Sequence, residues 1–155
     1  MKFTTKTEYG LISLIHMAGG KPAGRITTKE VAELEKYSPS YIEKIFQGLR
    51  DAGIVTSHQG NQGGYALARP TSEITLKQII DALEGDTFDL FCSRDDVICN
   101  HSATLCGLKE IWRRTKELLD AFYSGITLEM IVRSPNDIGI KVDELKKPYE
   151  IREIV

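Results

Sequence analysis

Apolar residues recur every three or four positions along most of this chain, which is the spacing of one buried face of a helix. Three such runs occupy the first third of the sequence, at residues 5–18, 27–34 and 39–52. The third begins with Pro39, a residue favoured in the first turn of a helix, and the connection before it, 35–38, is short. The chain is therefore predicted to begin with one helix followed by a helix-turn-helix unit.

The pattern then changes to two short β-prone runs. Residues 54–57 and 65–68 are joined by a segment, 58–64, that is rich in glycine and other turn formers, which predicts a β-hairpin. A helix-turn-helix followed directly by a hairpin is the outline of a winged helix-turn-helix domain. In such a domain the second helix of the helix-turn-helix enters the major groove of DNA. The predicted fold class is mostly α with a small β-hairpin wing.

The second half of the chain returns to helical spacing. Residues 75–83 and 127–132 predict two short helices, and 107–123 predict a long one between them. The apolar stripe of the long helix is too large to stay exposed on a lone helix, so we expect it to pair with a second copy of the chain. The residues of this stripe are Leu108, Ile111, Trp112, Leu118, Leu119 and Phe122.

These elements divide the chain into four expected parts. They are a DNA-binding domain in 1–85, a cysteine-rich loop in 86–106, a dimerisation helix with a short following helix in 107–132, and a charged tail without assigned structure in 133–155.

Composition narrows the class of protein. The 155 residues suit one small globular domain, and no apolar run approaches the ~18 residues of a membrane span, so we expect a cytoplasmic protein that does not enter a membrane. The net charge of −2 hides a split between a basic first part, with nine Lys and Arg against six acids in 1–70, and an acidic remainder. A charge split of this kind is typical of a nucleic-acid surface on one half. The sequence contains no catalytic signature, so we do not expect the protein to be an enzyme.

Three cysteines, Cys92, Cys99 and Cys106, lie in one polar stretch with equal gaps of six residues. Unrelated core cysteines have no reason to gather in this way. Structural zinc usually takes closer pairs and four ligands, whereas thiolates on a looser loop suit an iron–sulfur cluster. An odd number of cysteines in the cytoplasm also favours metal binding or thiol reactivity over a disulfide framework.

Three thiolates leave one ligand position open, and two residues are candidates for it. His101 lies inside the cysteine-rich loop, and Glu8 lies on the first helix. Each also has an ordinary alternative, because His101 can simply be exposed and Glu8 can form a capping box with Thr5. Spacing alone does not choose between the two.

Several polar residues on the predicted recognition helix can reach DNA. Ser38, Ser40 and Tyr41 stand at its start, Lys44 lies one turn further along, and Arg50 lies near its end. They can contact base edges or phosphates.

Taken together, residues 1–132 resemble the Rrf-type winged-helix transcriptional regulators, the group that contains the iron–sulfur regulators IscR and NsrR. The resemblance rests on the segments 1–9, 38–46, 49–55 and 63–65, on the three cysteines before a Trp-bearing helix, and on 126–128. It implies a homodimer that binds double-stranded DNA at a partly palindromic operator. It also implies operator contacts from Ser38, Ser40, Tyr41, Glu43 and Lys44, with Glu43 influencing the sequence class accepted.

The wing tip departs from the family pattern. Relatives often carry an arginine where this chain has Gln59, followed here by Gly60 and Asn61. Loss of that arginine removes a charged anchor for the minor groove, so the resemblance predicts wing contacts that are weaker or differently specific.

For the cofactor, the resemblance implies an iron–sulfur cluster of the 2Fe-2S or 4Fe-4S type, with 2Fe-2S slightly favoured. IscR-like members supply a His three residues after the last cysteine, where this chain has Lys109, which cannot be a ligand. NsrR-like members use an acidic residue on the first helix of the other subunit, and Glu8 stands at that position. Glu8 of the partner is therefore favoured over His101. The alternative within the same fold is a thiol-based redox regulator without metal, as in CymR.

Overall fold

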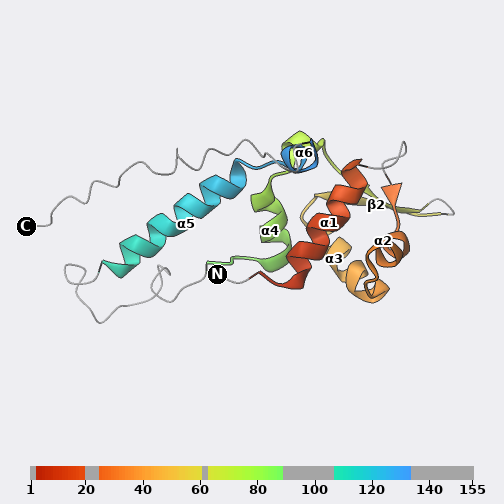
Figure 1. Cartoon of the computed structure of the whole chain (residues 1–155), viewed down its shortest axis with the longest axis horizontal. Coiled ribbons are helices and arrows are strands. Elements are labelled where there is room, and N and C mark those ends of the chain that lie inside the picture. Colours follow the sequence, from red (N-terminus) through yellow and green to blue (C-terminus); the bar gives the residue numbers. More distant parts are fainter. Residues whose placement is uncertain (1–2, 20–24, 61–62, 89–106, 134–155) are drawn as a thin grey trace, which may run out of the picture.

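A computed structural model describes residues 3–19, 25–60, 63–88 and 107–133 (Figure 1). In chain order its elements are α1 (Thr5–Gly19), β1 (Arg25–Ile26), α2 (Thr28–Glu35), α3 (Pro39–Asp51), β2 (Val55–His58), β3 (Gly64–Leu67), a 3₁₀ turn η1 (Thr71–Glu73), α4 (Leu76–Glu84), α5 (Leu108–Ser124) and α6 (Leu128–Arg133). The predicted fold class is confirmed: the protein is mostly helical with a small antiparallel sheet.

The helix-turn-helix is defined by its caps. Thr27 caps α2 in a capping box with Glu30, and Lys36 closes that helix in the left-handed conformation at φ 58°. Pro39 then occupies the first turn of α3, as the sequence predicts. These local features reverse the chain within a few residues and set α2 beside α3.

The sheet contains a strand that the sequence did not predict. β3 lies between β1 and β2 and is antiparallel to both, so Tyr65 faces Ile26 on one side and Ser57 on the other. β1 escaped prediction because it has only two residues and no periodicity to detect. β2 and β3 form the predicted wing.

The core lies between α1, α3, α4 and the sheet. Leu14, Ile42, Phe46 and Leu49 are among its fully buried side chains. The chain after α5 returns to this core, since the backbone N–H of Leu76 donates to Ile126 O and that of Leu128 donates to Ile74 O, each at 2.8 Å. The side chains of Ile126 and Leu128 are buried there, so α6 packs with the first 85 residues.

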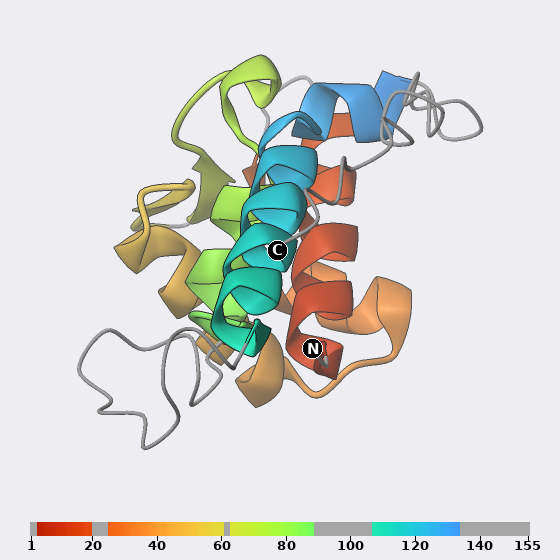
Figure 2. The same cartoon turned by 90° about the vertical axis from the view of Figure 1, so that its left-hand side faces the viewer.

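The C-terminal part of α5 packs against α4, and the rest of the helix extends away from α4 (Figure 1), so that α5 stands in front of α4 when viewed from that end (Figure 2). Ion pairs from Lys77 to Asp120 (3.5 Å) and from Lys116 to Asp86 (2.8 Å) join it to α4 and to the residues after α4. No residue of α5 is buried, although the helix has 17 residues and carries a strong apolar stripe. Within the described ranges, no helix combines the length and apolar character needed to cross a bilayer.

Candidate functional site

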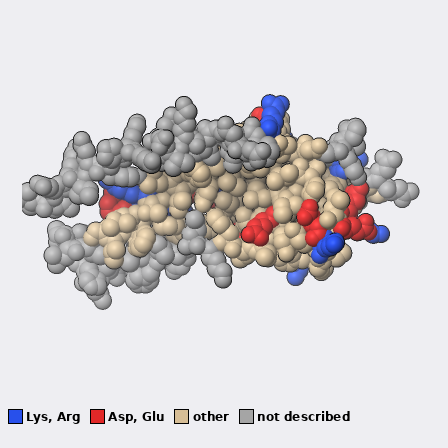
Figure 3. Space-filling model, in the orientation of Figure 1, with Lys and Arg blue, Asp and Glu red and all other residues tan. Residues whose placement is uncertain are grey.

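The exposed face of α3 presents short polar side chains and one lysine. Ser40, Lys44 and Gln47 are exposed at successive helical turns, and the face opposite them is buried in the core. On the face drawn in Figure 3, basic and acidic side chains mix at the end where α2 lies, so this view shows no uniformly basic patch. The sequence interpretation had not singled out Gln47, although its spacing from Ser40 and Lys44 was a usable signal.

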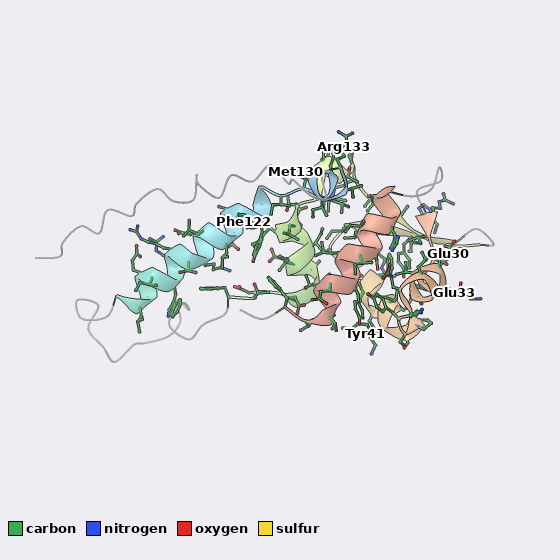
Figure 4. The ribbon with its side chains drawn as sticks, viewed as in Figure 1. Glu30, Glu33, Tyr41, Phe122, Met130 and Arg133 are labelled. Carbon is green, nitrogen blue, oxygen red and sulfur yellow. The ribbon has the colours of Figure 1, made fainter. Side chains whose placement is uncertain are left out.

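The start of α3 is tied to α1 by tyrosines. The Tyr41 hydroxyl lies 3.2 Å from Thr5 Oγ1, and the rings of Tyr41 and Tyr9 meet edge to face at a centroid distance of 5.8 Å. Figure 4 labels Tyr41. Tyr9 also stacks on Tyr37 at 3.6 Å, in the turn before α3. These contacts place Tyr9, the residue that follows Glu8, against Tyr41, which is expected to contact DNA.

Ser38 Oγ and Ser40 Oγ lie 2.9 Å apart and are both exposed. Two hydroxyls in this arrangement can reorient toward a base edge or a phosphate, since each can donate or accept.

Glu43 and Arg50 each have a partner inside the protein. Glu43 accepts a hydrogen bond from the Tyr65 hydroxyl at 3.0 Å, and Arg50 forms an ion pair with Asp51 at 3.2 Å. Arg50 is thus partly neutralised, whereas Lys44 has no ion pair to another described residue. Lys44 is the stronger candidate for a phosphate contact.

At the wing tip, Gln59 and Gly60 are exposed, and Asn61 lies outside the described residues. Gly60 has φ 109°, a conformation that glycine adopts readily. A side chain at Gly63 would come within 2.8 Å of the carbonyl oxygens of His58 and Gly60, so the tip requires glycine there as well.

The structure describes only one of the predicted cluster ligands, Glu8. Cys92, Cys99, Cys106 and His101 all lie outside the described residues. In the part of the chain that is described, no group of three or more His, Cys, Asp or Glu side chains could hold a metal ion. Glu8 is described, and its side chain is exposed on the first turn of α1.

The capping role considered for Glu8 is wrong. α1 begins at Thr5, which makes Thr4 the residue before the helix, and the carboxylate at this helix end comes from Glu84 instead. Glu84 accepts hydrogen bonds from the Thr4 backbone N–H at 2.9 Å, from Thr4 Oγ1 at 2.6 Å and from Thr7 Oγ1 at 2.6 Å. The Glu8 carboxylate has no hydrogen bond to another described residue, so it is available to a ligand.

The six residues of the predicted dimerisation stripe divide into two groups. Leu108, Ile111 and Leu118 point to solvent, with 48%, 54% and 41% of their surface exposed. The other three are partly buried within the protomer, where Trp112 contacts Phe88, Leu119 lies against α4 and Phe122 contacts Tyr123. Beside the exposed group, hydrogen bonds from Arg113 and Arg114 lower the pKa of Glu110 to about 2.

Comparison with known proteins places this arrangement in a family. The sequence model of the Rrf2 family, described as an iron-dependent transcriptional regulator, matches residues 3–134. The HTH-type transcriptional regulator IscR of Photorhabdus laumondii is 28% identical over 140 residues, which is 90% of this chain and 84% of the relative.

Two solved structures have the same fold. CymR, the global cysteine regulator of B. subtilis, superposes with a TM-score of 0.67 at 30% identity and covers 85% of this chain and 96% of its own. IscR of T. potens gives 0.67 at 29% identity, over 91% and 93% of the two chains. Both likenesses agree with the winged helix-turn-helix described above. The chain belongs to the Rrf2 family and is a DNA-binding transcriptional regulator rather than an enzyme.

Proposed function

We propose that this regulator binds its operator as a homodimer and that an iron–sulfur cluster controls the binding. Cys92, Cys99 and Cys106 of one protomer and Glu8 of the other would hold the cluster. The observation that carries the proposal is the exposed carboxylate of Glu8, which has no hydrogen bond to another described residue, on the helix whose next residue, Tyr9, packs against Tyr41 of α3.

The donor set fits such a group. Cysteine thiolates are the usual ligands of iron–sulfur clusters, commonly four of them, so three thiolates and one carboxylate would complete a set of four. A carboxylate is a harder ligand than a thiolate and is held less tightly by cluster iron, so Glu8 would be the ligand most easily displaced. When bound, the cluster would supply iron that responds to oxidants, nitric oxide or iron–sulfur supply.

The protein's own residues offer a route from such a ligand to DNA. Glu8 lies on the first turn of α1, where Thr5 and Tyr9 contact Tyr41 of α3, so a change in what Glu8 binds would be transmitted to the start of α3. The same helix end is bound to Glu84, the last residue of α4, two positions before the expected cysteine-rich loop. A change in that loop would therefore bias the position of α3, which is a shift between DNA-competent and incompetent dimers.

The dimer would form along α5. One line of residues along α5 has alternating spacings of three and four positions. It consists of Leu108, Ile111, Thr115, Leu118 and Phe122. This is the repeat of a two-helix seam, and the exposure of its leucines and isoleucine within one protomer supports a second copy as the partner. Two α3 helices related by this symmetry would read the half-sites of a partly palindromic operator in the cytoplasm.

A second candidate function has a specific observation in its favour. CymR, named as a cysteine regulator, superposes on this chain as well as IscR does, with equal TM-scores of 0.67. The alternative is a thiol-based regulator whose cysteines are oxidised reversibly without metal.

The test is anaerobic reconstitution of the full chain with iron and sulfide, followed by absorption and native mass spectrometry. The proposal predicts coloured dimers with one cluster of the 2Fe-2S or 4Fe-4S type per protomer, and a Glu8→Ala variant with a shorter cluster lifetime or an altered spectrum. Glu33→Ala, which removes another exposed helical carboxylate, is the matched control. An unchanged spectrum in Glu8→Ala would transfer the ligand role to His101 or solvent, and colourless zinc-loaded or metal-free protein would refute the cluster.

A further inference from the structure

A part-buried hydrogen bond joins the wing to the recognition helix. The Tyr65 hydroxyl, on β3, donates to Glu43 Oε1, on α3, at 3.0 Å. The Tyr65 ring is 7% exposed and stacks on Phe46 with the ring centroids 4.6 Å apart. Phe46 is itself fully buried, so the ring that carries this hydroxyl has little freedom to turn.

The backbone beneath Tyr65 is equally constrained. Tyr65 belongs to the central strand and pairs with Ile26 on one side and Ser57 on the other. At the preceding residue, Gly64, φ is 143° and a Cβ atom would lie 2.8 Å from the Ile26 carbonyl oxygen. The chain can therefore approach β1 this closely only with glycine at 64, and this approach fixes where the Tyr65 hydroxyl stands.

The Tyr65 hydroxyl keeps its proton, and so can donate a hydrogen bond, at neutral pH. Burial, reinforced by the hydrogen bond and negative charge of Glu43, raises the pKa of Tyr65 above its ordinary value of 10.0, although Arg50 opposes this shift. Tyr65 thus stays protonated at neutral pH. The second carboxylate oxygen of Glu43 has no hydrogen bond to another described residue, so it can accept one from a partner outside the protein.

Glu43 stands where a base contact is possible. It is only partly buried, and it lies one turn from Ser40 and one turn from Gln47, both exposed on the face of α3 that would enter the major groove. Within that groove a carboxylate accepts a hydrogen bond from the N4 amino group of cytosine and repels bases that present only acceptors. A glutamate without an internal contact could turn away from such a base, since its side chain has several rotatable bonds.

We propose that Tyr65 is a specificity-determining residue that holds the Glu43 carboxylate in one direction, so that α3 prefers cytosine at one position of each half-site. The inference rests on the proposed seating of α3 in the major groove. Tyr65 acts through Glu43 and does not itself need to touch the DNA.

The test compares base preferences of the full-length protein and its variants. A random-sequence duplex library would be selected with the wild type, Tyr65→Phe, Glu43→Ala and the double variant, and affinities would be measured on every single-base variant of the wild-type consensus. The proposal predicts that Glu43→Ala and Tyr65→Phe relax discrimination at the same base pair, by about tenfold for Glu43→Ala and several-fold for Tyr65→Phe. The double variant should be no more relaxed than Glu43→Ala alone.

Two further variants make the result specific. Glu43→Asp keeps the charge but shortens the side chain away from Tyr65, and it should lose the same preference. Tyr123→Phe makes the identical chemical change on α5 and should retain wild-type discrimination. Thermal unfolding of each variant checks that it is folded, and Tyr65→Phe is expected to fold because it retains the ring stacked on Phe46.

The possible failures are distinguishable. If Glu43→Ala changes one base preference while Tyr65→Phe and Glu43→Asp change none, or if the effects of Glu43→Ala and Tyr65→Phe add fully, the role of Tyr65 is refuted and operator reading by α3 stands. If Glu43→Ala changes no preference, the base contact is refuted. If the wild type enriches no sequence, the proposed operator reading itself fails and the inference falls with it.

Discussion

Glu84, the last residue of α4, accepts a 2.6 Å hydrogen bond from Thr7 in the first turn of α1. A carboxylate at this position is favoured because the first turn of a helix has unpaired N–H groups and a partial positive charge. The contact fastens the helix that carries Glu8 to the residues that lead into the expected cysteine-rich loop. It is therefore central both to the stability of the domain and to the proposed coupling.

Removing this carboxylate should destabilise the fold. Glu84→Ala loses the hydrogen bonds from Thr4 and Thr7, and we expect the free energy of unfolding to fall by about 1–2 kcal/mol, since Glu84 is only partly buried. Urea denaturation at neutral pH measures the loss. A change below a few tenths of a kcal/mol would mean that the contact does not hold α1 to α4.

The same group should make stability depend on pH. Partial burial alone would raise the pKa of Glu84, but hydrogen bonds from Thr4 and Thr7 outweigh it and lower the pKa below its ordinary 4.5. Its stabilising effect is therefore complete above that value and is lost as the pH falls through the lower, folded-state pKa. Glu84→Gln keeps an acceptor without the charge, so the stability difference between wild type and this variant should shrink on acidification. A constant difference from pH 7 to pH 3 would contradict the lowered pKa.

The exposed stripe of α5 predicts the effect of a charge on assembly. Leu118→Glu would bury two carboxylates in a dimer seam, so we expect the dimer dissociation constant to rise by about 100-fold or more. Leu34→Glu, on α2, is the matched control because Leu34 is 61% exposed outside the stripe. Sedimentation equilibrium distinguishes the two. Dimers of equal strength in both variants would place the interface elsewhere.

Lys44 of α3, which has no ion pair to another described residue, predicts a salt-dependent effect on DNA binding. Lys44→Ala should weaken binding to all sequences and reduce the slope of log affinity against log salt by about 1 per recognition helix. Arg133→Ala, on α6, removes a charge on the side of the molecule opposite Tyr41 and should leave the slope unchanged (Figure 4). Titrations at several salt concentrations provide the slopes, and equal slopes for wild type and Lys44→Ala would remove Lys44 from the interface.

The wing should not tolerate a side chain at Gly64. An added Cβ would lie 2.8 Å from the Ile26 carbonyl oxygen in a conformation with φ 143°, so Gly64→Ala should cost about 1–3 kcal/mol. Gly19→Ala is the control because a Cβ there meets nothing within 4 Å. Thermal unfolding of the two variants compares them directly, and equal melting temperatures would show that β3 can shift away from β1.

Features set by neighbouring residues were predictable from the sequence. Pro39 and the capping residues Thr27 and Thr75 mark their helices locally, so the helix-turn-helix and α4 appear where the pattern placed them. The glycines before Tyr65 likewise indicated the hairpin. Each of these signals acts over a few residues and survives in an isolated sequence.

Contacts between distant residues were not predictable. Glu84 is 77 positions from Thr7, and Tyr65 is 22 from Glu43, so neither hydrogen bond leaves a periodic trace. The capping box considered as an alternative role for Glu8 is wrong for this reason, because the carboxylate that caps α1 comes from the far end of α4. Likewise the division of the α5 stripe into exposed and inward-facing residues depends on the position of α4.

The proposed function requires that a cluster held by the three cysteines and Glu8 controls operator binding. The most direct measurement is the operator affinity of one anaerobic preparation before and after removal of its cluster, on the sequence selected by the wild type. We expect the operator affinity to change about tenfold or more when the cluster is removed, and this change should disappear when the cysteines are replaced by serine. Equal affinities of cluster-loaded and cluster-free protein would contradict it.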